Sequence, residues 1–314
     1  MLIKEQPQVS VMIITYNQID FIAETINSVL AQNYANLQLV VADDASTDGT
    51  QDLILKYKND YPEIIKLVLN EKNLGITANC NSALSVCTGK YIAVLGGDDV
   101  FLPNKLLKQV ALMESDDGIA ITYHAVDIFQ SQTNKTLFIT NQNKNDTPLT
   151  MHELLMCCIP GSSSIMVRKS MMPIYGFDPI LPTVSDWLFN IELAARGKIA
   201  FLPEVLGRYR KHGNQASFRT LELLEESLEN LNIAAKRYPD LCPATYISKG
   251  KIRYLQGEVY RRLMLGDRIT ARKLAVRSLS IGFEFKTVIL IALSLMPINA
   301  ILFKNIKNIL KRYF

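Results

Sequence analysis

The sequence predicts an α/β fold: a mostly parallel sheet flanked by helices, with a helical C-terminal extension. Short apolar runs alternate with segments of helical periodicity through the first half, and these segments have the lengths of strand–helix units. From about Thr220 the pattern is helical to the end of the chain. Repeated strand–helix units imply right-handed crossovers that place helices on both faces of one sheet.

The elements of the first half follow in a regular order. Strands covered on both faces lack polar alternation, so buried strands are expected at four continuous apolar runs: Val9–Thr15, Leu37–Ala42, Ile65–Leu69 and Tyr91–Leu95. Helices are expected where apolar residues recur with helical spacing: Ile22–Leu30, Leu53–Lys58 and Ala78–Val86.

After about residue 115 the elements become shorter. The apolar runs of this part predict short strands at Ile119–Tyr123, Val126–Gln130, Thr136–Ile139, Ser162–Val167, Ile199–Leu202 and Leu206–Tyr209. A helix is expected over Asp186–Arg196, with Gly197 as its C-terminal stop. We therefore divide the chain into a first domain (1–218), whose halves are 1–115 and 116–218, and a helical region (219–314).

The composition is that of a globular protein and narrows the range of partners. The 314 residues are 48% hydrophobic and carry a net charge of +4, which does not favour a nucleic-acid binder. The five cysteines have no framework spacing and fit a reducing compartment. The N-terminal segment lacks the pattern of a signal peptide, so we expect a cytoplasmic location.

Two adjacent carboxylates, Asp98 and Asp99, follow the fourth strand after two glycines. Open α/β sheets bind ligands at the carboxyl ends of their strands, and oxygen donors there suit a hard divalent cation that also binds phosphates. An Asp pair after a strand is also ordinary turn chemistry, so the pair alone leaves both interpretations open.

Polar side chains also follow the first and second strands and begin the third helix. They are Thr15, Tyr16, Asn17, Asp43, Asp44 and Asn79. Each could instead be part of a turn or a helix cap. Their joint occurrence at one edge of a parallel sheet predicts a pocket for a nucleotide diphosphate with a metal. The glycine signatures of dinucleotide-binding and P-loop folds are absent from the chain.

In order and spacing, these motifs resemble the inverting GT-A glycosyltransferases of family two. The resemblance extends from about residue 9 to residue 217 and rests on four segments: Thr15–Asn17, Asp43–Thr50, Asn73–Gly75 and Gly97–Asp99. It implies the GT-A fold, with a nucleotide-sugar-binding half (1–115) and an acceptor half (116–218). It also implies transfer from a nucleotide sugar, a UDP-sugar before others, to a carbohydrate or lipid-linked acceptor in cell-surface polysaccharide or lipopolysaccharide synthesis.

The resemblance assigns roles to individual residues at the strand ends. Tyr16 and Asp44 would contact the uracil, with Asp43 nearby. Asp98 would touch the ribose, and Asp99 would coordinate Mn²⁺ or Mg²⁺ bridging the two phosphates.

The chain departs from the family pattern at two positions. Many members have a further carboxylate where this chain has Gly96, so fewer protein ligands are expected around the metal. Many also have a basic residue where this chain has Cys80, which removes an ionic contact at that point.

Asp186, in the Thr183–Trp187 segment, is the candidate catalytic base. Sugar transfer to a hydroxyl needs a group that takes the hydroxyl proton, and a carboxylate at the start of a helix facing a pocket can do so. Locally, Asp186 could equally be a helix cap, but the resemblance implies an acidic base at this place. Trp187 could line the acceptor site or pack in the core.

A basic segment, Arg208–His212, follows the last expected strand. Its cationic side chains could neutralise a departing diphosphate or form a solvated surface loop. The resemblance implies a flexible loop that closes over the diphosphate, in which Arg208, Arg210 and His212 contact the donor and His212 could also bind the metal. The Gly161–Ser164 stretch could shape the acceptor pocket or simply lead into a strand.

The C-terminal tail (284–314) combines apolar and basic residues. Thr287–Phe303 has 17 uncharged residues, whereas a membrane span needs about 20 apolar residues. Beyond it, the apolar residues fall on one helical face and the charges are basic, with no Asp or Glu after Glu284. This pattern predicts a helix on an anionic membrane surface, on the inner face of the cell membrane; the alternative is a helix packed on the protein.

Two other functions compete with glycosyl transfer. A sugar nucleotidyltransferase would need a glycine-rich basic loop after the first strand, where this chain has Thr15–Gln18. A nucleotide-binding pseudo-enzyme or scaffold would not need Asp44, Asp99, Asp186 and His212 together.

Overall fold

The computed structural model describes residues 6–140, 147–156, 161–213 and 219–296. By their contacts these residues form two compact units. The sheet unit comprises Met1–Thr150 with Ile159–Phe218, and the helical unit comprises Met151–Cys158 with Arg219–Phe314. Helix α5 (Met151–Leu155) groups with the helical unit.

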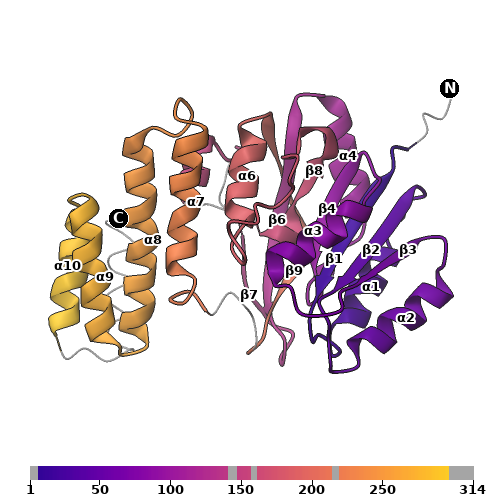
Figure 1. The fold of residues 1–314 in the computed structure, drawn as a ribbon, viewed down its shortest axis with the longest axis horizontal. Coiled ribbons are helices and arrows are strands. Elements are labelled where there is room, and N and C mark those ends of the chain that lie inside the picture. Colours follow the sequence, from indigo (N-terminus) through magenta and orange to yellow (C-terminus); the bar gives the residue numbers. More distant parts are fainter. Residues whose placement is uncertain (1–5, 141–146, 157–160, 214–218, 297–314) are drawn as a thin grey trace. The chain divides into compact units, whose positions relative to one another are not determined.

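In its described part, the sheet unit has a nine-stranded sheet in the order β3-β2-β1-β4-β8-β6-β9-β5, with β7 paired to β6 (Figure 1). The strands are β1 (Val9–Thr15), β2 (Leu37–Asp43), β3 (Ile65–Leu69), β4 (Tyr91–Gly96), β5 (Val100–Phe101), β6 (Ile119–Gln130), β7 (Thr136–Ile139), β8 (Met166–Arg168) and β9 (Lys198–Lys211). Strands β1 to β4 run parallel, β8 joins β4 to β6 in the antiparallel sense, and β6 and β9 are parallel. The predicted fold class is confirmed.

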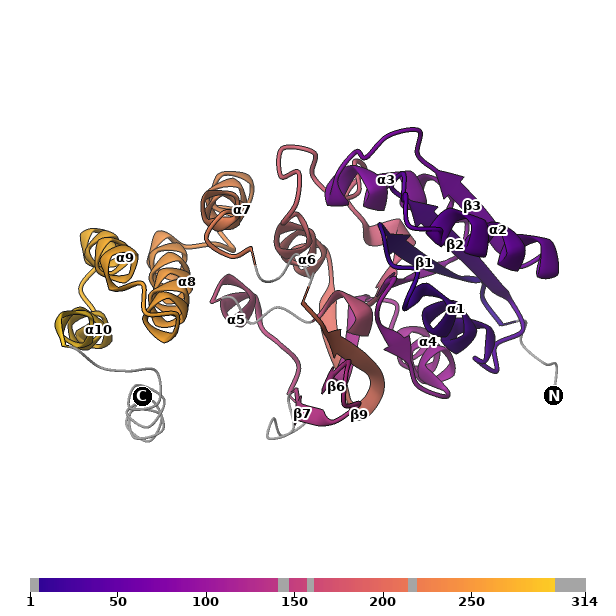
Figure 2. The same cartoon turned by 90° about the horizontal axis from the view of Figure 1, so that it is seen from below.

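Helices cover both faces of this sheet, as the crossover argument requires. They are α1 (Ile22–Leu30), α2 (Thr50–Asp60), α3 (Ile76–Val86), α4 (Lys105–Ser115) and α6 (Asp186–Ala194), with short 3₁₀ turns η1 (Ser162–Ser164) and η2 (Lys169–Met171). Helices α1 and α4 lie on one face and α3 lies on the other (Figure 2).

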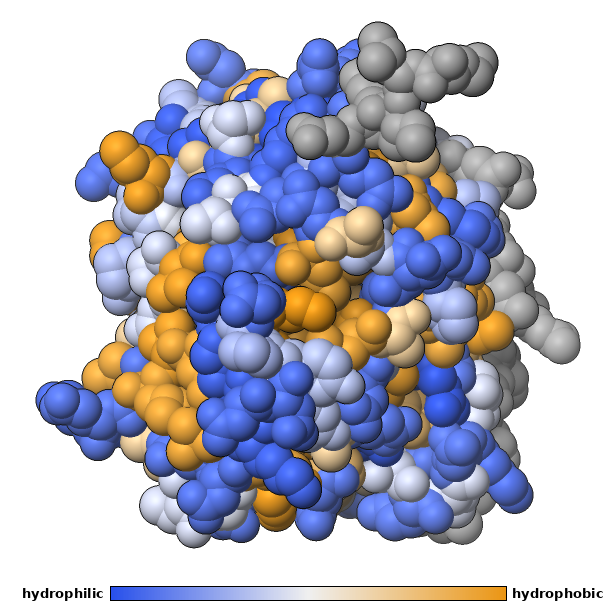
Figure 3. Space-filling view, turned by 90° about the vertical axis from the view of Figure 1, so that its right-hand side faces the viewer, coloured by the Kyte–Doolittle hydropathy of each residue, from blue (hydrophilic) through white to orange (hydrophobic). Residues whose placement is uncertain are grey.

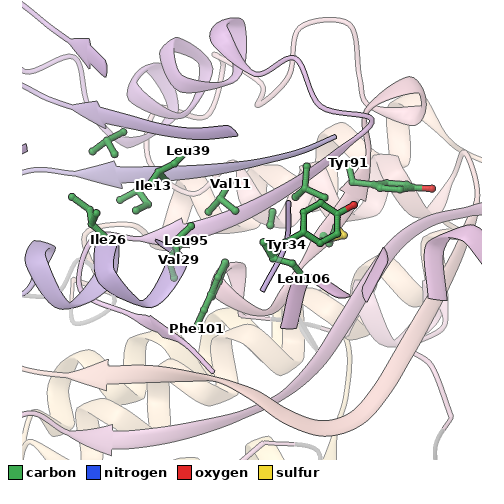
Figure 4. Close-up of a cluster of buried hydrophobic side chains, with 14 of the residues drawn as sticks. Val11, Ile13, Ile26, Val29, Tyr34, Leu39, Tyr91, Leu95, Phe101 and Leu106 are labelled. Carbon is green, nitrogen blue, oxygen red and sulfur yellow. The ribbon is translucent and has the colours of Figure 1, made fainter. Parts of the chain in front are cut away.

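The main core lies between the sheet and helices α1, α2 and α4. Alternate residues of β1, such as Val11 and Ile13, pack against Ile26 and Val29 of α1 (Figure 4). The residues between them in β1 are also almost fully buried, because α3 covers the opposite face. Burial on both faces explains why β1 has no polar alternation.

In two places, two short strands expected from the sequence are joined in the structure as one long strand. Ile119–Tyr123 and Val126–Gln130 belong to β6, and Ile199–Leu202 and Leu206–Tyr209 belong to β9. The two strands pair along their whole lengths, with register shifts at His124 and Ala125. The residues that interrupt the apolar pattern are therefore accommodated as bulges.

The expected strand Ser162–Val167 is wrong in its first half. Residues 162–164 form η1, and β8 begins only at Met166. The Ser164 hydroxyl donates to the Gly161 carbonyl at 2.7 Å, and such a local side-chain bond favours a turn over a strand.

The helical unit contains α5 and four longer helices, in agreement with the helical pattern after Thr220. The longer helices are α7 (Leu224–Arg237), α8 (Ala244–Met264), α9 (Arg268–Ile281) and α10 (Phe285–Leu295). Leucines of α8, α9 and α10 form a shared core. Within the described residues, no helix has the length and apolarity needed to cross a membrane. The predicted tail helix after residue 296 lies outside the described residues.

The surface on the β3 side of the sheet unit carries several exposed apolar side chains. They are Leu55, Tyr61, Leu69, Leu74 and Ile76. On the face seen in Figure 3, apolar areas are divided by hydrophilic side chains.

Candidate functional site

The expected convergence of polar strand ends is present in the sheet. Strand β1 pairs with β2 on one side and β4 on the other, with Thr15 opposite Asp43 and Ile14 opposite Gly96. The Asp44 amide donates to the Thr15 carbonyl at 3.0 Å. The three strands therefore end side by side, at the edge where open α/β sheets bind ligands.

Asp43 and Asp44 are buried and hold the loops around this edge. The Asp43 carboxylate accepts the Ser46 amide at 2.8 Å and the Gln51 side-chain amide at 2.7 Å. Asp44 accepts the backbone amide of Gly75 at 2.9 Å and that of Leu74 at 2.8 Å. Gly75 has a φ of +89°, so glycine suits this turn. Both carboxylates therefore fix the loops at this edge of the sheet.

The side chains of Asn17 and Asn79 also hydrogen-bond to the backbone at this edge. The Asn17 side-chain oxygen accepts the Thr47 amide at 2.8 Å. The Asn79 side-chain amide donates to the Ala42 carbonyl at 3.2 Å. In contrast, Tyr16 has 47% of its surface exposed, so its ring is available for a flat ligand.

Two buried polar atoms at this edge have no hydrogen-bond partner among the described residues: the Thr15 hydroxyl and Gln18 Oε1. Both lie beside Gly97, where a Cβ would come within 2.2 Å of Gln18 Oε1 and 2.9 Å of Thr15 Oγ1. Unsatisfied buried polar groups are costly, so they fit a place that a polar ligand completes. Gln18 directly follows Thr15–Asn17 but was not predicted from the sequence as a site residue.

Asp98 and His212 form a pair close to the surface. Asp98 Oδ2 lies 2.8 Å from His212 Nε2, and the side chains are 14% and 12% exposed. The His212 ring also packs on Phe21, with centroids 4.7 Å apart. Phe21 was not selected from the sequence, and its position just before α1 gave no signal of this contact.

Asp99 is oriented into the protein instead. Its Oδ1 accepts the Arg210 amide at 3.0 Å, and its Oδ2 accepts the Ser163 hydroxyl. Burial, and then the negative charge of Asp98, raise the pKa of Asp99 well above its usual range. The two carboxylates therefore have different partners: Asp98 pairs with His212, whereas Asp99 bonds to Arg210 and Ser163.

The expected basic loop begins later than predicted, because residues up to Lys211 belong to β9. Arg208 pairs with Asp127, its Nε 2.8 Å from Asp127 Oδ2. Arg210 donates from Nε to the Asp98 carbonyl at 2.7 Å and from Nη2 to Glu24 at 2.5 Å. Pairing of β9 with β5 and β6 keeps this segment extended, so both guanidinium groups are bonded within the sheet unit.

Asp186 is the first residue of α6 and is partly buried. The Ser162 hydroxyl donates to Asp186 Oδ2 at 3.4 Å. The neighbouring Trp187 is 1% exposed and packs in the core. Among the described residues, no group of three or more His, Cys, Asp or Glu side chains is arranged to hold a metal.

The mostly parallel sheet flanked by helices, with polar strand ends at one edge, has the architecture of the GT-A fold. The family model described as "Glycosyl transferase family 2" matches residues 10–171. The chain belongs to this family.

Relatives and solved structures agree with this assignment. The chain is 31% identical over 169 residues to the Escherichia coli UDP-Glc:alpha-D-GlcNAc-diphosphoundecaprenol beta-1,3-glucosyltransferase WfgD, covering 54% of this chain and 63% of WfgD. A Mycobacterium tuberculosis relative is 31% identical over 208 residues, which are 65% of this chain and 59% of that protein. The chain thus spans less than two thirds of the length of these relatives.

Two solved structures share the fold. S. aureus TarS (residues 1–349), in complex with UDP-GlcNAc, has a TM-score of 0.67 at 16% identity and covers 89% of this chain and 82% of its own. The mannosyltransferase PcManGT of Pyrobaculum calidifontis, in complex with GDP-Man and Mn²⁺, has a TM-score of 0.60 at 17% identity, covering 94% and 82%.

Proposed function

We propose that this glycosyltransferase moves a hexosyl or N-acetylhexosaminyl group from a UDP-sugar to a carbohydrate or lipid-linked acceptor, with inversion at the anomeric carbon. The observation that carries the proposal is the convergence of polar residues at the ends of β1, β2 and β4, with the Asp98–His212 pair directly after β4 and Asp186 bonded to the neighbouring turn η1. The substrate classes are supported by the UDP-Glc and the diphosphoundecaprenol-linked acceptor in the name of WfgD, and by the UDP-GlcNAc bound to TarS. A cell-surface polysaccharide or lipopolysaccharide is the corresponding product.

In this proposal the nucleotide occupies the edge formed by β1, β2 and β4. The exposed Tyr16 ring stacks on the uracil. Asp43 and Asp44 keep the surrounding loops in place, and the Thr15 hydroxyl and Gln18 amide bond to the ribose or the phosphates.

Asp98 and His212 fit a divalent metal, because a carboxylate oxygen and an imidazole nitrogen already lie 2.8 Å apart near the surface. Both are ligand types found in proteins for Mn²⁺, and Mg²⁺ accepts the carboxylate. When bound, Mn²⁺ or Mg²⁺ would offset charge on the diphosphate. We assign the metal to Asp98 in place of Asp99, because both carboxylate oxygens of Asp99 already accept hydrogen bonds, one from the Arg210 amide and one from the Ser163 hydroxyl.

Asp186 acts as the general base. Its carboxylate takes the proton from the acceptor hydroxyl while the hydroxyl oxygen bonds to the anomeric carbon and the bond to the diphosphate breaks. Attack from the face opposite the leaving group inverts the centre in one step. Arg210 supports this arrangement by holding the Asp98 carbonyl.

A screen of nucleotide sugars tests the proposal. UDP release is measured with each sugar, with Mn²⁺ and with a chelator. We expect release from at least one UDP-sugar, lost on chelation. Binding of UDP without release from any sugar would instead indicate a nucleotide-binding scaffold.

We also propose that the tail (284–314) associates with an anionic membrane surface. On α10, Phe285, Val288 and Leu295 are exposed at helical spacings that place them on one side. The sequence that follows is basic and has no acidic residue, which suits anionic lipid.

Vesicle sedimentation tests this part of the proposal. The full chain should pellet with vesicles containing phosphatidylglycerol and not with purely zwitterionic vesicles, and deletion of residues 284–314 should abolish pelleting. Equal pelleting of the deletion variant would contradict it.

A further inference from the structure

The turn η1 lies between the acidic pair and Asp186 and bonds to both. The Ser163 hydroxyl donates to Asp99 Oδ2, and it accepts the Gly96 amide at 3.3 Å. The hydroxyl of the preceding residue, Ser162, donates to Asp186 Oδ2 at 3.4 Å. Two consecutive serines thus connect the end of β4 with the start of α6.

The turn itself is held firmly in place. The Ser164 amide and hydroxyl both donate to the Gly161 carbonyl at 2.7 Å. The side-chain amide of Gln109, a fully buried residue of α4, donates to the Ser164 carbonyl at 3.0 Å. Ser163 and Ser164 are almost completely buried. The Ser162 and Ser163 hydroxyls are therefore presented from a fixed backbone.

Asp99 is held on its other sides as well. Its carboxylate accepts the amide of Arg210, two residues before His212. Its carbonyl accepts the hydroxyl of Thr25, a buried residue of α1, at 2.8 Å. Asp99 thus joins α1, β9 and η1 at one point.

We infer that Ser162 and Ser163 are positioning residues of the transfer reaction. Ser162 orients the carboxylate of Asp186 toward the acceptor. Ser163, through Asp99, fixes the loop that carries Asp98 and thereby the donor site. Because the serines are adjacent on one rigid turn, they set the distance between donor and base, and transfer is sensitive to that distance. This inference rests on the proposed function.

The experiment compares Ser162→Ala, Ser162→Thr and Ser163→Ala with the wild type. UDP affinity is measured by calorimetry with Mn²⁺ present, and turnover is measured as UDP release from the UDP-sugar that the wild type hydrolyses fastest. Ser115→Ala is the matched control, because the Ser115 hydroxyl is exposed and bonds only locally, to Leu112. Thermal unfolding confirms that each variant is folded.

We expect Ser162→Ala to lower kcat about fivefold with unchanged UDP affinity, because the hydrogen bond that it removes from Asp186 is long, at 3.4 Å, and therefore weak. Ser162→Thr, which keeps the hydroxyl, should restore most of the turnover. Ser163→Ala should weaken UDP affinity about tenfold, because it leaves two buried groups, the Asp99 side chain and the Gly96 amide, without the Ser163 hydroxyl. A wild-type kcat in Ser162→Ala, or equal losses of kcat and UDP affinity in both alanine variants, would overturn the inference. If the wild type releases UDP from no sugar, the proposed function itself fails.

Discussion

The two halves of the sheet unit build their parts of the site in different ways. In the nucleotide-sugar-binding half, each strand end is followed by a loop, and the site residues bond mainly within neighbouring loops, as Asp43 does with Ser46. In the acceptor half, β9 and η1 bring residues to an edge that belongs to the other half. Arg210 bonds to Asp99, and His212 to Asp98, across more than a hundred positions of sequence. Local pattern therefore describes the first half well and the second half poorly.

The largest effect is expected at Asp186, the acidic residue that the acceptor half contributes to the site. We expect Asp186→Asn to lower transfer by about 10²–10⁴-fold, the usual contribution of a general base. UDP affinity should stay at the wild-type level, because Asp186 is not among the residues proposed to bind UDP. The measurements are steady-state UDP release and calorimetry. Turnover near the wild-type value would remove Asp186 as the base.

A second test separates the two adjacent carboxylates. We expect Asp98→Asn to weaken Mn²⁺-dependent UDP binding by about 10–100-fold, as for loss of a group around a metal site. Asp99→Asn should keep the Mn²⁺ dependence, because Asp99 is bonded to Arg210 and Ser163. UDP titrations at several Mn²⁺ concentrations measure both effects. Loss of the Mn²⁺ response in Asp99→Asn alone would return the metal to Asp99.

The buried polar core of the acceptor half gives a pH-dependent prediction. His124 of β6 is 1% exposed, its Nδ1 donates to the Ala125 carbonyl at 2.7 Å, and Nε2 has no partner among the described residues. Burial, and then the charge of Lys105, lower the pKa of His124 from 6.5 to about 3. Below pH 6.5 the unfolded chain binds a proton that the folded chain does not, so stability falls as the pH falls toward 3.

The loss amounts to about 1.4 kcal/mol per pH unit, or about 2 kcal/mol at pH 5. His124→Asn keeps a donor at the position of Nδ1 and removes the titration. It should flatten the pH dependence of the unfolding free energy between pH 6.5 and 4, measured by urea denaturation. An unchanged slope in this variant would contradict the assignment.

The smallest expected effect belongs to Gln18, a residue of the nucleotide-sugar-binding half that local pattern missed. Gln18→Ala should weaken UDP binding about fivefold, the value of one hydrogen bond. Gln18 Oε1 has no hydrogen-bond partner among the described residues, and we propose that it accepts a hydrogen bond from the bound nucleotide sugar. Gln8→Ala, just before the opposite end of β1, is the control. If both variants bind UDP equally well, Gln18 does not contact the donor.

The sequence by itself determined the α/β class, the order of the first four strands and helices, and the edge where their polar ends meet. It could do so because buried parallel strands and their helices leave strong local periodicities, and because parallel strands all end at the same edge. Membership of the family also followed from motifs within about two thirds of the chain.

Only the tertiary structure decided how the acidic pair is divided, where β9 ends and what η1 connects. Asp98 and Asp99 are alike in sequence, and the pairing of β9 with β5 and β6 turned one of them toward His212 and the other toward Ser163. Contacts between distant segments of the chain decide which partner each carboxylate has. Such contacts leave no periodicity in the chain, and this is why local pattern described the strand ends but not the partners of Asp98 and Asp99.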